Sequence, residues 1–220
     1  MRILSVGDSW AAGIWDIRGG KHVNTGPGYV KQLNKIAEVD VMWGWNNQEA
    51  LFNIAKHHHD YDVVLFFVTD PFRDITNPKK HYSFYVNDFL TADELIKANE
   101  TLLESTIQSA NSFEANIKLI GGCHSLKHRN DSNIIIHSVS ELVSDGKYNH
   151  PRLWDSGWGG MLNFDNCSKD MSRVWLDNRE QQLKMESEPF QEYFWPDGYH
   201  PNAYSNKILG KELVKILTSK

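Results

Sequence analysis

The sequence predicts an α/β domain in which a parallel sheet is covered by helices on both faces. Short apolar runs alternate with segments of helical periodicity, and residues 61–68 are apolar almost throughout, as expected for a strand buried on both faces. The length of 220 residues and the hydrophobic fraction of 40% suit one packed core. We therefore expect a single domain over residues 1–220, with an irregular insertion around residues 124–170, where Asn, Asp, Ser and Gly are frequent.

The expected elements follow from periodicity and from the residues that interrupt it. Strands are expected at residues 2–6, 39–43, 61–68 and 117–120, and helices at residues 29–37, 48–57, 91–110, 171–185 and 204–217. Gly7 closes the first strand, and a glycine-rich loop is expected to follow it. Thr91 and Glu94 have the spacing of a capping box at the start of the longest helix.

Charge and apolar patterning exclude several classes of partner. The chain has 23 Lys and Arg against 28 Asp and Glu, and no basic cluster suited to a phosphate backbone, so we expect no nucleic-acid partner. The start lacks an apolar run long enough for a secretory signal, and nowhere do 18 apolar residues run together. We expect a cytoplasmic or otherwise soluble protein. Cys123 and Cys167 are expected to be reduced thiols.

Ser9 is the strongest candidate for a nucleophile. It follows the first expected strand directly, after Gly7 and Asp8, and glycine tolerates the tight turn needed there. A serine hydroxyl becomes a useful nucleophile when a rigid, exposed turn presents it beside a histidine. This placement follows the logic of the strand-to-turn nucleophile elbow, although the sequence differs from the Gly-x-Ser-x-Gly motif of α/β-hydrolases.

Asp197 and His200 are the candidate partners of Ser9. They form an Asp-x-x-His pattern just before the last expected helix. In a tight loop, this spacing lets the Asp197 carboxylate accept the Nδ1–H of His200, which leaves Nε2 free to face Ser9. Pro201 disfavours helical geometry at His200. The three side chains together predict a Ser-His-Asp catalytic triad.

The two motifs, taken together, resemble the first and last motif blocks of the SGNH (GDSL-like) hydrolase superfamily. The similarity in layout covers nearly the whole chain, from Gly7-Asp8-Ser9 to Asp197-x-x-His200. The resemblance implies a three-layer α/β/α, flavodoxin-like domain with a central parallel sheet and a triad that acts on esters. It also implies that no metal or other cofactor is needed.

The resemblance further implies an oxyanion hole, formed by the N–H of Ser9 and by a glycine and an asparagine that follow later strands. Gly44 matches the glycine by order. Where the family has Gly-x-Asn-Asp, this chain has Phe-Val-Thr-Asp, so Thr69 is the expected donor, through its hydroxyl or its backbone N–H, with Asn46 or Asn47 as alternatives. Removing one such donor typically lowers the rate about 10²-fold to 10³-fold. The departure therefore predicts a slower, altered or inactive esterase.

Each of these residues also has a purely structural interpretation. Ser9 can be a turn serine that caps a helix, Asp197 a turn residue and His200 a surface histidine. Gly44 can simply end a strand, and Thr69 can satisfy local backbone groups. The joint occurrence of nucleophile and base motifs favours catalysis.

Other conspicuous residues are expected to be structural. Asp8 is expected to bond the backbone of its own turn, and histidines 57–59 point in different directions on a helix end, which favours a solvated terminus over a metal site. Arg73 is expected either to contact substrate or to pair with Asp70 or Asp74. Most tryptophans are expected to pack in the core or at its rim, although aromatic faces near the site suit a sugar ring or an acyl chain. The tryptophans considered are Trp10, Trp15, Trp43, Trp45, Trp154, Trp158 and Trp195.

The leading hypothesis is a serine esterase that cleaves an ester-linked acyl group, with an O-acetyl group on a carbohydrate as the favoured substrate. A small-molecule or glycan ester is thus the expected partner. Two alternatives stay open: an acyltransferase with the same triad, and a non-catalytic glycan-binding module that retains the fold. The sequence does not indicate an oligomeric state.

Overall fold

The computed structural model describes residues 1–18, 21–69, 71, 92–122, 125–127, 129–147, 192–194 and 200–219. Among the sequence predictions, the helix at 171–185, the cap at Thr91 and both cysteines lie outside the described residues.

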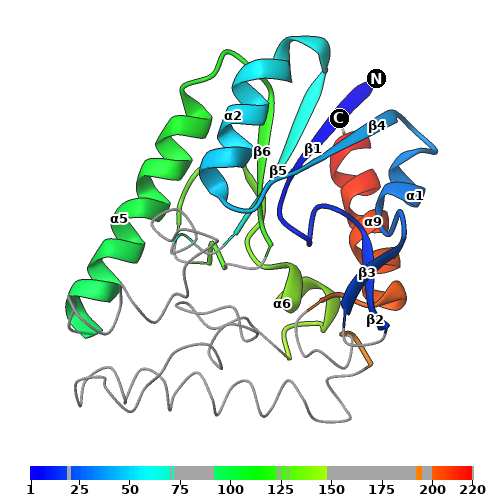
Figure 1. Ribbon diagram of the computed structural model, residues 1–220. Helices are drawn as coiled ribbons and strands as arrows, with labels where there is room; N and C mark the ends of the chain where they lie inside the picture. Colours follow the sequence, from blue (N-terminus) through cyan, green and yellow to red (C-terminus); the bar gives the residue numbers. More distant parts are fainter. Residues whose placement is uncertain are drawn as a thin grey trace.

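Five parallel strands form the central sheet (Figure 1). They are β1 (Arg2–Gly7), β4 (Glu38–Trp43), β5 (Val63–Val68), β6 (Ile117–Gly121) and β7 (Ile134–Ile136). Their order in space is β4-β1-β5-β6-β7. Counted along the chain, this is the order 2-1-3-4-5 of flavodoxin-like sheets, in which ligands bind where the order reverses, at the carboxyl ends of the first and third strands. In this chain those strands are β1 and β5.

Helices cover both faces of the sheet, which confirms the predicted three-layer α/β/α class (Figure 1). Helices α2 (Asn47–His57) and α5 (Ala92–Asn111) pack on one face. Helices α1 (Val30–Leu33), α6 (Val139–Val143) and α9 (Ala203–Thr218) pack on the other. Strand β5 contributes side chains to both cores and is buried along its whole length, as the apolar run at its position predicted.

Polar side chains fix where three of the helices begin. Asn46, Ser138 and Asn202 precede α2, α6 and α9, and each accepts a backbone N–H from the first turn. Such caps satisfy donors that have no partner within the helix. The cap on α9 fixes the entry of that helix two residues after His200.

Two parts of the fold differ from the expectation. Strands β2 (Ile14–Arg18) and β3 (Lys21–Gly26) form an antiparallel hairpin where a glycine-rich loop was expected. The described part of residues 124–170 is not irregular throughout, because it contains β7 and α6. Only three residues form β7, and its polar neighbours hid it from a search for apolar runs.

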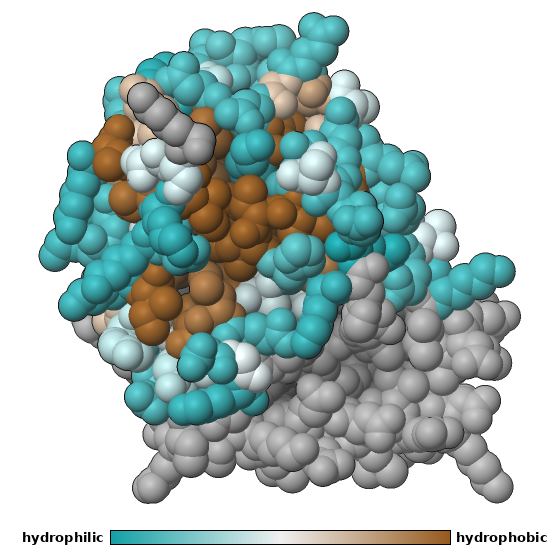
Figure 2. Space-filling model, turned by 180° about the vertical axis from the view of Figure 1, so that it is seen from behind, coloured by the Kyte–Doolittle hydropathy of each residue, from teal (hydrophilic) through white to brown (hydrophobic). Residues whose placement is uncertain are grey.

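Seen from behind, apolar side chains gather on the described part of the surface (Figure 2). A groove of about 500 Å³ lies where β7, α6 and α9 meet, with Ile135, Leu142 and Ile216 among its lining residues.

Within the described part of the chain, no helix combines the length and apolar character needed to cross a membrane.

Candidate active site

A tight turn after β1 presents Ser9. The turn is closed by the N–H of Ala11, which donates to the carbonyl of Asp8 at 3.0 Å. Gly7 enters it with φ +146°, and a Cβ there would lie 2.7 Å from the carbonyl oxygen of Phe67. Only glycine fits both the backbone angle and the close approach to β5. The turn is therefore held against the neighbouring strand at the point where the sheet order reverses.

His200 comes to this turn from the other end of the chain. It is 3% exposed, and the next residue, Pro201, forms an isolated bridge with Phe194. Asn202 then donates its N–H to the carbonyl of Tyr193 at 3.0 Å and its Nδ2 to the carbonyl of Glu192 at 2.8 Å. These bonds fix the backbone that carries the imidazole.

The structure brings Ser9 and His200 together: Oγ of Ser9 lies 2.7 Å from Nε2 of His200. The two residues are 191 positions apart in the sequence. When the imidazole is neutral with its proton on Nδ1, Nε2 accepts the hydroxyl proton of Ser9, and this is the geometry of a serine activated by a base. Asp197, predicted as the third member, lies outside the described residues.

Gly44 and Thr69, the predicted oxyanion donors, follow β4 and β5 at the same edge of the sheet. The N–H of Gly44 donates to the carbonyl of Gly7 at 2.8 Å, and the N–H of Thr69 donates to Oδ1 of Asn47 at 2.9 Å. The hydroxyl of Thr69 donates to Oδ2 of Asp8 at 2.5 Å. Their role in an oxyanion hole stays a prediction, and it requires these groups to change partners when substrate binds.

A buried polar network surrounds the turn. Asp8 is 1% exposed and accepts the N–H of Trp10 at 3.0 Å, which confirms the expected bond within its own turn. Asn47 is fully buried, and its amide also donates to the carbonyl of Thr69 at 3.1 Å, so that its side chain pairs with both backbone groups of Thr69. Asn47 thus holds the end of β5 to the start of α2. The sequence suggested Asn47 only as an alternative oxyanion donor, because no local pattern marks a bond between positions 47 and 69.

The aromatic residues near the site differ in exposure. Trp10 is 2% exposed and packs against Phe194, with ring centroids 6.3 Å apart. Trp43 is 55% exposed and lies beside Gly7 in the register of β1 and β4. Trp45 is half-buried. The remaining candidates lie where the structure describes no side chain: Arg73, Trp15, Trp154, Trp158 and Trp195.

The three consecutive histidines lie at the end of α2, and one of them is buried. His58 is 7% exposed, and its Nδ1–H donates to the carbonyl of Ile54 at 2.9 Å, which closes the end of α2. The expectation of a solvated terminus is wrong for this residue, since His58 also packs against Phe113. Among the residues that the structure describes, no group of three or more His, Cys, Asp or Glu side chains is placed to hold a metal ion.

Comparisons with known proteins give matches only among solved structures. No protein-family model and no curated protein matches the sequence. A lipase/acylhydrolase from Enterococcus faecalis is 15% identical, with 99% of this chain and 95% of that chain covered and a TM-score of 0.41. A catalytic mutant of an acetylxylan esterase from Geobacillus stearothermophilus is 14% identical, with 100% and 94% covered and a TM-score of 0.43. At these identities and TM-scores, the matches assign no activity to this chain.

Proposed function

We propose that this protein is a serine esterase that hydrolyses an ester-linked acyl group. The observation that carries the proposal is the 2.7 Å separation between Oγ of Ser9 and Nε2 of His200. The pair lies where β1 and β5 end, at the reversal of strand order that ligands occupy in flavodoxin-like sheets. A serine that only caps a turn has no need of a buried histidine brought from the far end of the chain.

In the proposed reaction, Oγ of Ser9 attacks the ester carbonyl carbon while Nε2 of His200 takes its proton. The tetrahedral intermediate collapses, the alcohol leaves with the proton from His200, and an acyl-enzyme remains. Water, deprotonated by His200, then releases the acid and restores Ser9. We assign to Asp197 the role of orienting the His200 ring. The N–H of Ser9 is the first proposed oxyanion donor, and the backbone N–H groups of Gly44 and Thr69 are the proposed additional donors.

We propose an O-acetyl group on a carbohydrate as the substrate. Trp43 supports this choice, because it is 55% exposed and is paired in register with Gly7, two residues before Ser9. An exposed indole on the strand next to the turn of the nucleophile suits a sugar ring. Replacing Trp43 with alanine should raise KM for an acetylated xylo-oligosaccharide and leave turnover of p-nitrophenyl acetate within about twofold, a difference of under roughly 0.5 kcal/mol.

The test of the enzyme assignment is the turnover of p-nitrophenyl acetate by wild type, Ser9→Ala and His200→Ala. Both variants should lose almost all activity, and a fluorophosphonate probe should label wild type but not Ser9→Ala. Ser219→Ala is the matched control, since Ser219 is an exposed serine directly after α9 whose hydroxyl donates to the carbonyl of Lys215 at 2.7 Å. Equal turnover by wild type and Ser9→Ala would exclude Ser9 as the nucleophile.

A further inference from the structure

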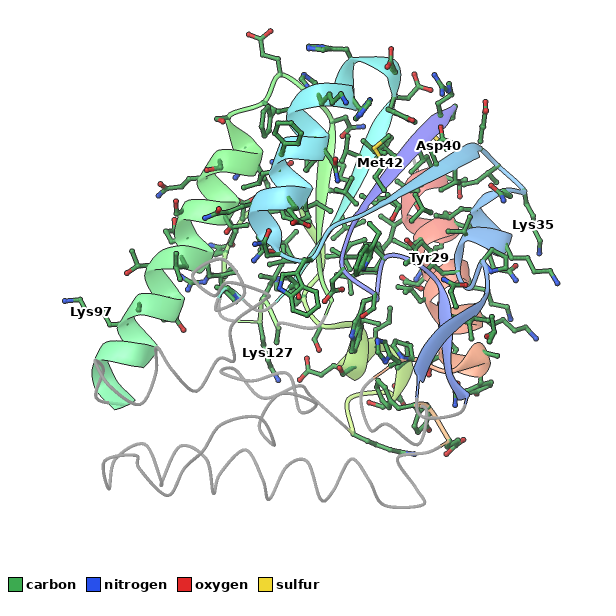
Figure 3. All side chains as sticks on the ribbon, in the orientation of Figure 1. Tyr29, Lys35, Asp40, Met42, Lys97 and Lys127 are labelled. Carbon is green, nitrogen blue, oxygen red and sulfur yellow. The ribbon has the colours of Figure 1, made fainter. Side chains whose placement is uncertain are left out.

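The segments that carry Ser9 and His200 are joined by a hydrogen-bonded path through Tyr29 and Asn206. Tyr29 is fully buried and lies near α9 (Figure 3). Asn206, in the first turns of α9, is 2% exposed. Neither residue belongs to the motifs that suggested the active site.

Tyr29 holds the turn of the nucleophile through its hydroxyl. The hydroxyl donates to the carbonyl of Ala11 at 2.7 Å, and Ala11 is the residue whose N–H closes the turn around Ser9. A carbonyl can only accept, so the single proton of the phenol is committed to Ala11, and the hydroxyl of Ser5, 2.5 Å away, donates to Tyr29. Burial raises the pKa of Tyr29 above its ordinary value, which keeps the phenol a donor.

Asn206 holds the segment of the histidine through its amide. Its Nδ2 donates to the carbonyls of Pro201 at 2.9 Å and Asn202 at 3.0 Å, directly after His200. Its Oδ1 accepts the N–H of Tyr29 at 3.2 Å. Both amide protons and the oxygen are therefore used, so the side chain has one defined orientation.

The approach between these segments is close. At Gly28, which has φ +55°, a Cβ would lie 2.4 Å from Oδ1 of Asn206. Tyr29 also packs on Phe67, with ring centroids 5.1 Å apart, so its ring is fixed against β5. Hydrogen bonds thus connect Pro201 to Asn206, Asn206 to Tyr29, and Tyr29 to Ala11.

We infer that Tyr29 and Asn206 are positioning residues that set the distance between Ser9 and His200. The inference rests on the proposed function. A misplacement of about 1 Å between reacting groups costs up to about 10²-fold in rate. Tyr29→Phe keeps the ring but frees the carbonyl of Ala11, so kcat for p-nitrophenyl acetate should fall about 10-fold to 100-fold, while KM changes less than twofold.

Two further variants separate positioning from stability. Tyr29→Phe alone leaves the hydroxyl of Ser5 without its acceptor, and adding Ser5→Ala removes that hydroxyl, so the double variant should recover part of the lost stability. Its kcat should stay low, because the carbonyl of Ala11 still lacks its donor. Thr106→Val is the matched control: Thr106 is 4% exposed and bonds the carbonyl of Leu102 at 2.9 Å, within α5 on the other face of the sheet. It should lower the melting temperature and leave kcat unchanged.

The ¹⁵N signals of the His200 ring give a readout that needs no turnover. They should move in Tyr29→Phe and stay in place in Thr106→Val, and Asn206→Asp, which loses the donors to Pro201 and Asn202, should also move them. A folded Tyr29→Phe with wild-type kcat and an unmoved His200 signal would overturn the inference. Failure of the proposed function would be seen instead in the wild type, as absence of both ester turnover and fluorophosphonate labelling.

Discussion

Thr69→Val tests what the threonine hydroxyl does after β5. Valine keeps the shape and the backbone N–H, and it removes the bond from the hydroxyl to the buried carboxylate of Asp8 at 2.5 Å. A hydrogen bond to a charged group contributes about 1.5–3 kcal/mol to stability. For a chain of this size, that corresponds to a fall in melting temperature of roughly 3–12 °C. If the hydroxyl mainly holds Asp8, we expect this loss of stability with a change in kcat of under about tenfold, or about 1.4 kcal/mol.

The assay pairs thermal unfolding by circular dichroism with kcat for p-nitrophenyl acetate. Thr106→Val serves as the reference, since its hydroxyl bonds a neutral carbonyl and should contribute about 1 kcal/mol. Thr69→Ser should keep most of the stability, because it keeps the hydroxyl. A structural role of the hydroxyl is refuted if Thr69→Val melts no lower than Thr106→Val and yet loses about 10²-fold or more in kcat, since that pattern is typical of a lost oxyanion donor.

Three other predictions concern the fold around the site. Gly7→Ala should lower the free energy of unfolding by more than about 2 kcal/mol in urea titrations, whereas Gly146→Ala, with φ +77° but open space around it, should cost about 1 kcal/mol. Leu65→Ala, in the buried strand β5, should cost about 2–5 kcal/mol, and Phe52→Ala, at a residue 67% exposed, under about 0.5 kcal/mol. Because burial raises the pKa of Tyr29, the folded state keeps a proton that the unfolded chain loses above about pH 10. The contribution of this proton to the free energy of unfolding is complete below that pH and falls by up to about 1.4 kcal/mol per pH unit above it. In alkaline urea titrations, wild type should therefore lose stability faster than Tyr29→Phe.

The sequence predicted four strands of the central sheet and the pair Ser9 and His200, because both kinds of feature leave a local pattern. A buried parallel strand is a continuous apolar run, as in β5, and a nucleophile turn and an Asp-x-x-His pattern are short motifs. Strand β7 has only three residues, and the hairpin β2–β3 carries glycines that indicate a loop, so neither left a pattern that periodicity detects.

The supporting network around the site left no such signal. Asn47 and Thr69 are 22 positions apart, and Tyr29 and Asn206 are 177 apart. Hydrogen bonds between distant residues depend on which loops the sheet order brings together, and composition or period does not encode that choice. The sequence therefore predicted Ser9 and His200 as a pair, and the structure shows hydrogen bonds that fix the segments on which they lie.

The two ends of the sheet use polar groups in opposite ways, which supports placing the function at the carboxyl ends. At the amino ends, Nη2 of Arg2 lies 3.3 Å from Oδ2 of Asp40, and the backbone N–H of Arg2 donates to the Asp62 carboxylate. These side chains are exposed, and exposed ion pairs contribute about 0–1 kcal/mol to stability and weaken with salt. At the carboxyl ends, Asp8 and Asn47 are buried and hydrogen-bonded. Burying polar groups costs free energy that an apolar core avoids, so a fold selected only for stability has no reason to gather them there. A site for chemistry does need them, because Asp8 and Asn47 hold the turn of Ser9 and the end of β5 in one geometry while charge develops at the reacting atoms.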